Sequence, residues 1–475
     1  MCCVRHAFLV GLSVLCLFAL APTFKQLLHI YQLYTYAVTL PTSILQHHKK
    51  ITMTSLKVFS LSGRSLKLDS EEDIEPHLKP LILADTITEI HLGGNTLGTG
   101  ACSALASLLR TKSTLQIARF DDIFTSRLLS EIPPALSSLL TALLELPNLH
   151  TVDLADNAFG LNTVAPLVDF LSKHVPLKHL ILNNNGMGPN AGTQIADALT
   201  ALAERKEETR KAGHEVPHLE TVICGRNRLE SGSMAAWAKA FQAHKKVKVV
   251  KMVQNGIRQD GIQLLLREGL KGCEKLEVLD LQDNTFTITG ATALAEVVEG
   301  WKQIRELGVG DSLLGGRGAV KLAEALGRGG NRKLEVLRLQ YNEIDKKGVQ
   351  GVLRAANGSL DCLRRVELNG NKFSEDDEGV EGLRLLLEER KEEAGDVEEK
   401  EWGLDELSDL EEESDEEEEE DVGSDEEEEK EEEEEREERG ERILKEADEE
   451  EASKVSQKKD DDVDALADKL GKTGI

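Results

Sequence analysis

Aromatic residues are scarce in this chain and make up only 4% of its 475 residues. A globular enzyme core usually contains more of them, whereas a solenoid core can be filled mainly with leucine. The seven cysteines are scattered, and none belongs to a Cys-x-x-Cys pair. Their spacing therefore gives no reason to expect a zinc or other metal site. Single, unpaired cysteines are typical of proteins in a reducing compartment.

Two chemical signatures are also missing. The chain has no glycine-rich loop with P-loop spacing and no Gly-x-Ser-x-Gly motif. Nucleotide binding by that route and a serine nucleophile of that type are therefore not expected. These absences favour a binding scaffold that holds no cofactor, and we expect the chain not to be an enzyme.

Negative charge is concentrated at one end of the chain. Residues 401–475 contain 37 acidic and 10 basic residues, a net charge of −27, out of −29 for the whole chain. Residues 395–460 are rich in Glu and Asp and cannot bury enough apolar surface to offset their chain entropy, so we predict a disordered acidic tail there. Apolar residues at helical spacing follow, and a short terminal helix is predicted over residues 461–475.

A repeated pattern organises most of the remaining chain. The stretch Leu276–Phe286 has alternating apolar residues, then Asn284 and a last apolar residue. With a half-formed first copy, the pattern occurs eleven times. The other copies are Leu56–Leu66, Ile87–Leu97, Leu115–Thr125, Leu149–Phe159, Leu177–Met187, Leu219–Leu229, Val247–Ile257, Ile304–Leu314, Leu334–Ile344 and Leu363–Phe373.

The pattern is that of a leucine-rich repeat. Alternating apolar residues predict a short strand with one buried face, and a buried Asn side chain can satisfy the backbone of the neighbouring turn. Most copies are 28 to 34 residues apart, which leaves room for a helix between strands. We predict an α/β solenoid, a horseshoe whose strands line the concave face, with repeats of about 28 residues that resemble those of ribonuclease inhibitors.

The repeats also define the expected domain boundaries. The repeat domain is predicted over residues 53–373, and residues 374–394 have the apolar spacing of a capping helix. One long step contains Glu204–Pro217, a charged segment that predicts a longer helix and a solvated loop.

Residues 1–52 lie outside the repeats. The apolar run Ala7–Ala21 has the length of a signal-peptide core but is short for a membrane span. Met53 stands three residues before the first repeat, so we expect translation to start there and residues 1–52 to be a gene-model artefact. The alternative is a targeting segment or anchor, and membrane association is expected only in that case.

Five segments go beyond generic repeats. They are Asp121–Pro133, Leu182–Pro189, Ile223–Glu230, Met252–Arg258 and Leu281–Phe286. In these segments, in the order of its repeats and in its acidic tail, the chain resembles the Ran GTPase-activating protein family in its fungal form. The resemblance implies that the chain stimulates GTP hydrolysis by the small GTPase Ran in its GTP form. It implies a cytoplasmic protein that gives nucleocytoplasmic transport its direction.

The resemblance further implies two catalytic residues. The essential arginine of the family's Phe-Thr-Gly-Arg motif falls on Arg127, with Ser126 in place of Gly and Leu129 where the family has a basic residue. The family's rim asparagine falls on Asn184, beside the structural Asn185. In this scheme Asn184 helps to fix the GTPase residues around the glutamine that holds the attacking water. Arg127 is expected to be exposed, and it either anchors the interface or reaches the phosphate.

Neighbouring loops of the same edge carry the remaining expected partner contacts. These residues are Arg226, Arg228, Gln254 and Asp283. For Arg228 and Asp283, an exposed charge or a local ion pair is an equally open interpretation. We expect a monomer that binds no nucleic acid, binds a Ran-binding protein as a further partner, and also occurs at the periphery of the nuclear envelope.

Two other kinds of protein remain as alternatives. One is an acidic, histone-binding leucine-rich repeat module, whose repeats are shorter than the period near 28 residues found here. The other is a ribonuclease-inhibitor-like scaffold, which shares that period but would lack the Phe124–Arg127 motif and would not need an acidic tail.

Overall fold

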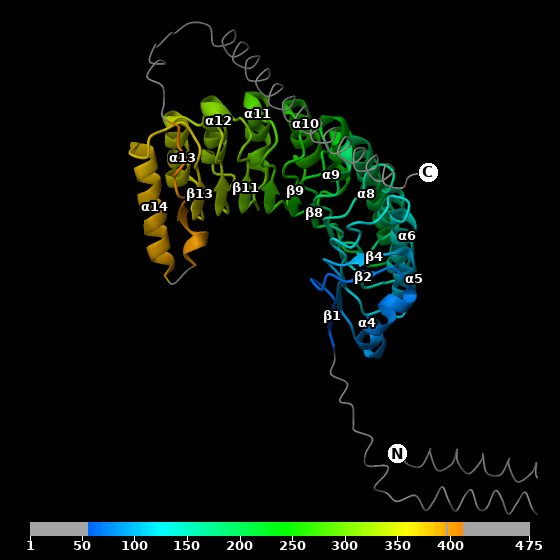
Figure 1. The fold of residues 1–475 in the computed structure, drawn as a ribbon. Coiled ribbons are helices and arrows are strands. Elements are labelled where there is room, and N and C mark those ends of the chain that lie inside the picture. The colour runs from blue at the N-terminus through cyan, green and yellow to red at the C-terminus, as the bar shows by residue number, and fades with distance from the viewer. Residues whose placement is uncertain (1–55, 396–397, 412–475) are drawn as a thin grey trace, which may run out of the picture. The chain divides into compact units, whose positions relative to one another are not determined.

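The computed structural model describes residues 56–395 and 398–411. Its strands form one parallel sheet of twelve strands in chain order and a small sheet of two. The large sheet lines the inner side of the solenoid and the helices lie on the outer side (Figure 1). The predicted leucine-rich repeat fold is therefore confirmed. The expectations for residues 1–52, 412–460 and 461–475 lie outside the described residues.

The strands of the large sheet are short and share one register. In each strand of three residues the middle residue is buried and aligns with the middle residue of its neighbour. The large sheet contains β1 (Val58–Ser60), β3 (Glu89–His91), β5 (Ile117–Arg119), β6 (Thr151–Asp153), β7 (His179–Ile181), β8 (Thr221–Ile223), β9 (Val249–Lys251), β10 (Val278–Asp280), β11 (Glu306–Gly308), β12 (Val336–Arg338), β13 (Arg365–Glu367) and β14 (Gly403–Leu404), and the small sheet contains β2 (Lys67–Leu68) and β4 (Thr96–Leu97).

Helices connect successive strands and bury one face against the sheet and the adjacent helices, as parallel strands require. In α11, for example, Ala291, Leu294 and Val297 are buried. The α-helices are α4 (Glu71–Leu83), α5 (Thr99–Leu109), α6 (Ile132–Leu144), α7 (Ala165–Leu171), α8 (Gly188–Lys211), α9 (Met234–Ala243), α10 (Gln259–Leu264), α11 (Thr287–Val297), α12 (Gly315–Gly327), α13 (Lys346–Gly358) and α14 (Glu378–Ala394), with shorter turns at η1 (Ser231–Ser233), η2 (Leu265–Leu270), η3 (Val298–Gly300) and η4 (Glu399–Glu401). Within the described residues, no helix is both long and apolar enough to cross a membrane.

Buried asparagines link each turn to the next. The Nδ2 of Asn185 donates to the carbonyl oxygens of Leu154 at 3.1 Å and Leu182 at 2.9 Å. Its Oδ1 accepts from the backbone N–H of Asn157 at 3.0 Å. The same contact, from the backbone of one repeat to the amide oxygen of the next, recurs along the solenoid. We call this series of positions the asparagine ladder, and it is the structural role that the repeat pattern predicts.

The C-terminal end departs from the sequence prediction. Residues 398–411, which the composition places in a disordered tail, instead add strand β14 to the open edge of β13. The carboxylate of Asp405 accepts from the backbone N–H groups of Leu368 at 2.8 Å and Asn369 at 3.0 Å. The prediction of disorder is thus wrong for this segment, because apolar side chains within it pack on the core and its backbone pairs with the sheet edge.

The charged insertion contains an unexpected buried cation. Helix α8 runs through it to Lys211, and residues 212–220 form an irregular loop, as the sequence predicts. However, Lys206 is only 1% exposed, and its Nζ donates to the carbonyl oxygens of Val175, Leu177 and Pro217 at 2.6 to 2.8 Å. Burial lowers the pKa of this amine to about 7. Lys206 therefore fastens the insertion to the preceding repeat.

Candidate partner-binding rim

The loops after the strands present one residue each at the same place, directly before the ladder position. All eleven of these residues have a positive φ, between 45° and 72°. The backbone N–H of nearly every one donates to a carbonyl of the next repeat, so the backbone of the row is fixed. Apart from the glycines, most of these residues are exposed. We call this row the rim. It consists of Gly63, Gly94, Asp122, Asp156, Asn184, Arg226, Gln254, Asp283, Asp311, Tyr341 and Gly370.

Four of the six predicted site residues fall on consecutive positions of the rim. They are Asn184, Arg226, Gln254 and Asp283, which follow β7, β8, β9 and β10. Asn184, Arg226 and Gln254 are exposed and Asp283 is half-buried. Arg228 lies two residues beyond Arg226, on the same loop. The structure therefore brings these five residues onto one edge of the solenoid.

Charge interactions run along this part of the rim. Burial, with the nearby charge of Asp311, raises the pKa of Asp283, while the Arg226 guanidinium acts in the opposite direction. Arg226 and Asp283 are two repeats apart along the rim, yet their charges influence each other. This stretch offers a partner both a cation and a carboxylate.

Toward the amino terminus the rim becomes acidic and hollow. A hollow of about 560 Å³ is lined by Gly63, Gly94, Asp122, Asp156 and Asn184, together with other loop residues. The Nδ2 of Asn184 donates to Oδ1 of Asp156 at 2.9 Å. Burial and the charges of Asp121 and Asp156 raise the pKa of the neighbouring Asp153. Asn184 thus stands at the boundary between an acidic hollow and the mixed-charge part of the rim.

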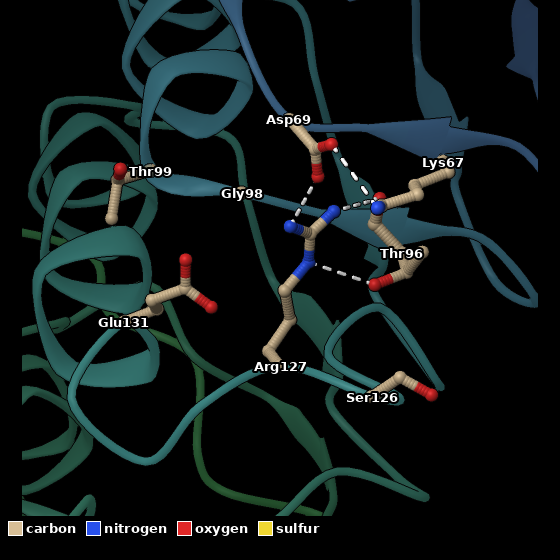
Figure 2. Close-up of a pocket in the computed structure, with 8 residues that line it drawn as sticks. All are labelled: Lys67, Asp69, Thr96, Gly98, Thr99, Ser126, Arg127 and Glu131. Carbon is tan, nitrogen blue, oxygen red and sulfur yellow. Dashed lines mark hydrogen bonds and ion pairs between the residues drawn. The ribbon is translucent and has the colours of Figure 1, made fainter. Parts of the chain in front are cut away.

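Arg127 lies elsewhere. It lines a second hollow, formed by residues around β2, β4 and the start of α5 together with Ser126 and Glu131 (Figure 2). Its Nε donates to Oγ1 of Thr96 at 2.8 Å, and its Nη2 donates to the carbonyl oxygen of Thr96 at 2.9 Å. Its Nη1 pairs with the carboxylate of Asp69. This hydrogen bond holds the pKa of Asp69 below its usual value.

The expectation that Arg127 is exposed is therefore wrong: only 7% of its side chain is accessible. The cause is its engagement by residues of two earlier repeats. The second hollow also contains Lys67 and Glu131, so its two cations face two carboxylates, and it has no net charge with which to attract a phosphate. The structure favours Arg127 as an anchor for the Phe124–Arg127 loop.

The residues that follow Arg127 expose apolar surface. Leu128 is 68% exposed and Leu129 is 60% exposed. Leu129 stands where the family has a basic residue, so any contact that it makes with a partner is apolar. Beyond Glu131, the chain enters α6 with Pro133 and Pro134 in the first turn, where proline is well tolerated.

The chain contains one motif with metal-ligand spacing that the cysteine pattern does not reveal. His214–His218 reads His-Glu-Val-Pro-His, the spacing of a zinc-protease motif. That motif needs a helix to place both histidines on one face, whereas here the segment is an irregular loop that contains Pro217. His218 instead accepts a hydrogen bond from Arg210 at 3.1 Å. Among the described residues, no group of three or more His, Cys, Asp or Glu side chains could hold a metal ion.

Comparisons with known proteins agree with this architecture. A family model described as "Leucine Rich repeat" matches residues 272–295 and 330–353. Ran GTPase-activating protein 1 of Saccharomyces cerevisiae is 40% identical over 341 residues, 70% of this chain and 83% of that protein. The Ran GTPase-activating protein of Drosophila melanogaster is 34% identical over 333 residues, 70% of this chain and 54% of that protein. The ribonuclease inhibitor of Sus scrofa is 28% identical over 171 residues, 36% of each chain.

The strands on the inner side, the asparagine ladder and the outer helices define a leucine-rich repeat solenoid with a polar rim. Its identity to the yeast protein extends over most of both chains. The chain belongs to the Ran GTPase-activating protein family, as the resemblance in its loops indicates.

Proposed function

We propose that this chain stimulates GTP hydrolysis by a Ran-type GTPase in its GTP form, and that the rim from Asn184 to Asp283 binds that partner. Family membership supports the activity. The single observation that carries the assignment of the surface is the row of Asn184, Arg226, Gln254 and Asp283, held on a rigid ladder and directed outward. The scaffold alternative has weaker support, because the ribonuclease inhibitor match is less identical and covers half as much of the chain.

GTP hydrolysis needs an oriented water and stabilisation of the charge that develops on the transferred phosphate. Asn184 offers an exposed amide to the GTPase residues that hold this water. Orientation of reacting groups can contribute several kcal/mol of barrier reduction. The chain completes the site of another protein and needs no substrate pocket of its own, so it acts as an activator and not as an enzyme.

Arg127 acts at a distance in this proposal. Because its guanidinium is occupied by Thr96 and Asp69, it holds the Phe124–Arg127 loop and does not reach the phosphate. Thr125, on the same loop, lines the hollow that contains Asn184. Loosening this loop would therefore disturb the surface beside Asn184.

The decisive test is single-turnover hydrolysis of GTP-loaded Ran with and without the protein. Asn184→Gly keeps the positive φ of the turn and removes only the amide, so it is the appropriate variant. We expect it to lower stimulation about 100-fold, the scale for loss of one key polar group in such a site. Wild-type protein that leaves the hydrolysis rate unchanged would refute the function, and a fully active Asn184→Gly would refute the assigned role of Asn184.

The remaining features of the proposal concern the cell. The chain acts as a monomer in the cytoplasm, with a pool at the periphery of the nuclear envelope, and assembles with a Ran-binding protein but with no nucleic acid. Light scattering of the purified protein tests the monomer, and microscopy of a tagged full-length protein tests the location. Pull-down with GTP-loaded Ran, with and without a Ran-binding protein, tests the assembly.

A further inference from the structure

A carboxylate fixes the direction in which Asn184 presents its amide. Asp156 occupies the rim position of the preceding repeat, and its Oδ1 accepts from Nδ2 of Asn184 at 2.9 Å. An ionised carboxylate can only accept hydrogen bonds, so it selects the orientation in which the amide nitrogen faces it. The amide oxygen of Asn184 must then point away from Asp156.

The backbone under this pair is rigid. Asp156 and Asn184 both have left-handed backbones, with φ of 58° and 53°. The N–H of Asp156 donates to the carbonyl of Asn183 and the N–H of Asn184 donates to the carbonyl of Gly225, each at 2.9 Å. The relative position of the two side chains is thus set by the ladder, and the charge-assisted contact sets their orientation.

We infer that Asp156 is a positioning residue for the GTPase-activating site, which holds Asn184 so that its amide oxygen accepts a hydrogen bond from an N–H group of the partner. This inference rests on the proposed function. It goes beyond it by assigning the acceptor to this side of the interface and the donor to the GTPase. Without Asp156, the amide of Asn184 can rotate and present its nitrogen, which cannot accept.

The test uses catalytic amounts of the protein and a concentration series of GTP-loaded Ran. Asp156→Gly removes the carboxylate and tolerates the positive φ. We expect it to lower kcat about tenfold, with KM changed by less than about threefold, because orientation is lost while the docking surface remains. Asp156→Asn keeps an acceptor oxygen and should recover most of this loss. Asp311→Gly, the same change at an exposed rim position five repeats on, controls for the turn itself.

The double variant separates positioning from an independent effect. If Asp156 acts through Asn184, Asp156→Gly should change little when Asn184→Gly is already present. Additive losses, a loss confined to KM, or an Asp156→Asn variant as impaired as Asp156→Gly would each overturn the inference.

A spectroscopic measurement tests the pair without the GTPase. In ¹⁵N-asparagine-labelled full-length protein, the side-chain amide signal of Asn184 can be assigned by its disappearance in Asn184→Gly. Asp156→Gly should shift this signal and speed up its hydrogen exchange, whereas Asp311→Gly should not. An unchanged signal overturns the positioning role. Wild-type protein that fails to stimulate hydrolysis refutes the proposed function instead, so the two failures are distinguishable.

Discussion

Asn185→Ala is expected to destabilise the solenoid although it lies next to Asn184. The Asn185 side chain is only 3% exposed. Its removal takes a donor from the carbonyl oxygens of Leu154, Leu182 and Asn183, but each keeps another, which for Asn183 is the N–H of Asp156. Asn157 Nδ2 still donates to Leu154 at 3.0 Å, and Asn227 Nδ2 still donates to Leu182 at 2.8 Å. The backbone N–H of Asn157, in contrast, loses the acceptor that it has at 3.0 Å.

These contacts give the expected magnitude. A buried N–H left without an acceptor costs about 1–3 kcal/mol, and the loss of the three donated contacts, whose acceptors all keep another donor, adds about 1 kcal/mol. We therefore expect Asn185→Ala to lower the free energy of unfolding by about 2–4 kcal/mol. Urea unfolding of the wild type and the variant measures this loss. Hydrogen exchange at the backbone N–H of Asn157 should in addition be faster in the variant than in the wild type.

The neighbouring Asn184→Gly is the matched control. Asn184 is exposed, and glycine accepts its positive φ, so the free energy of unfolding should change by less than about 1 kcal/mol. The two variants should thus separate stability from activity at adjacent residues. A larger loss of stability in Asn184→Gly than in Asn185→Ala would show that the assignment of ladder and rim is reversed.

Three further predictions concern other parts of the chain. Arg127→Ala should lower the free energy of unfolding by about 2 kcal/mol and should also lower the stimulation of GTP hydrolysis. Reduced stimulation with unchanged urea unfolding would contradict the anchoring role. Burial lowers the pKa of His174 to about 4 from about 6.5, so the unfolded state binds more protons between these values. Stability should then be full above pH 6.5 and fall toward pH 4 by about 3 kcal/mol, and urea unfolding of His174→Gln should show a weaker pH dependence. A chain ending at Ala394 should melt at a lower temperature than one ending at Glu411, because Leu368 and Asn369 lose the carboxylate of Asp405. Both truncated chains should keep most of the maximal stimulation of the full-length protein. Their stopped-flow association with GTP-loaded Ran should be slower than that of the full-length protein at low salt only. An association rate that does not depend on the tail would leave solubility as the role of the tail.

The ladder could be predicted from the sequence because its physics is local and periodic. An apolar strand pattern followed by Asn284 or Asn342 at a fixed offset predicts both the strand and the turn. The rim residues follow from the same register, since each stands one place before a ladder position. For this reason the sequence alone places Asn184, Arg226, Gln254 and Asp283 on one edge.

The contacts of Arg127 could not be predicted in this way. Its partners Asp69 and Thr96 are 58 and 31 residues earlier in the chain. Asp69 lies outside the repeat copies, and Thr96 fills a variable position of the copy Ile87–Leu97. In residues 398–411 the acidic composition gives no indication that Leu404, Leu407 and Leu410 pack on the core. The burial of Lys206 could likewise not be predicted, because it lies among the charged residues of the insertion. In each case a contact between distant residues outweighs local composition.

The backbone of the rim gives an independent reason to assign function to two of its residues. A left-handed backbone costs little for Gly, Asn or Asp, but about 1–2 kcal/mol for most other residue types. Three rim positions carry such other residues: Arg226, Gln254 and Tyr341. Tyr341 has a structural explanation, since its hydroxyl donates to Asp409 at 3.1 Å and helps to hold the segment that contains β14. Arg226 and Gln254 lie instead between Asn184 and Asp283, on the stretch proposed to bind the GTPase. Because Arg226 and Gln254 keep a strained backbone there, we infer that these side chains are retained for contact with a partner and not for stability.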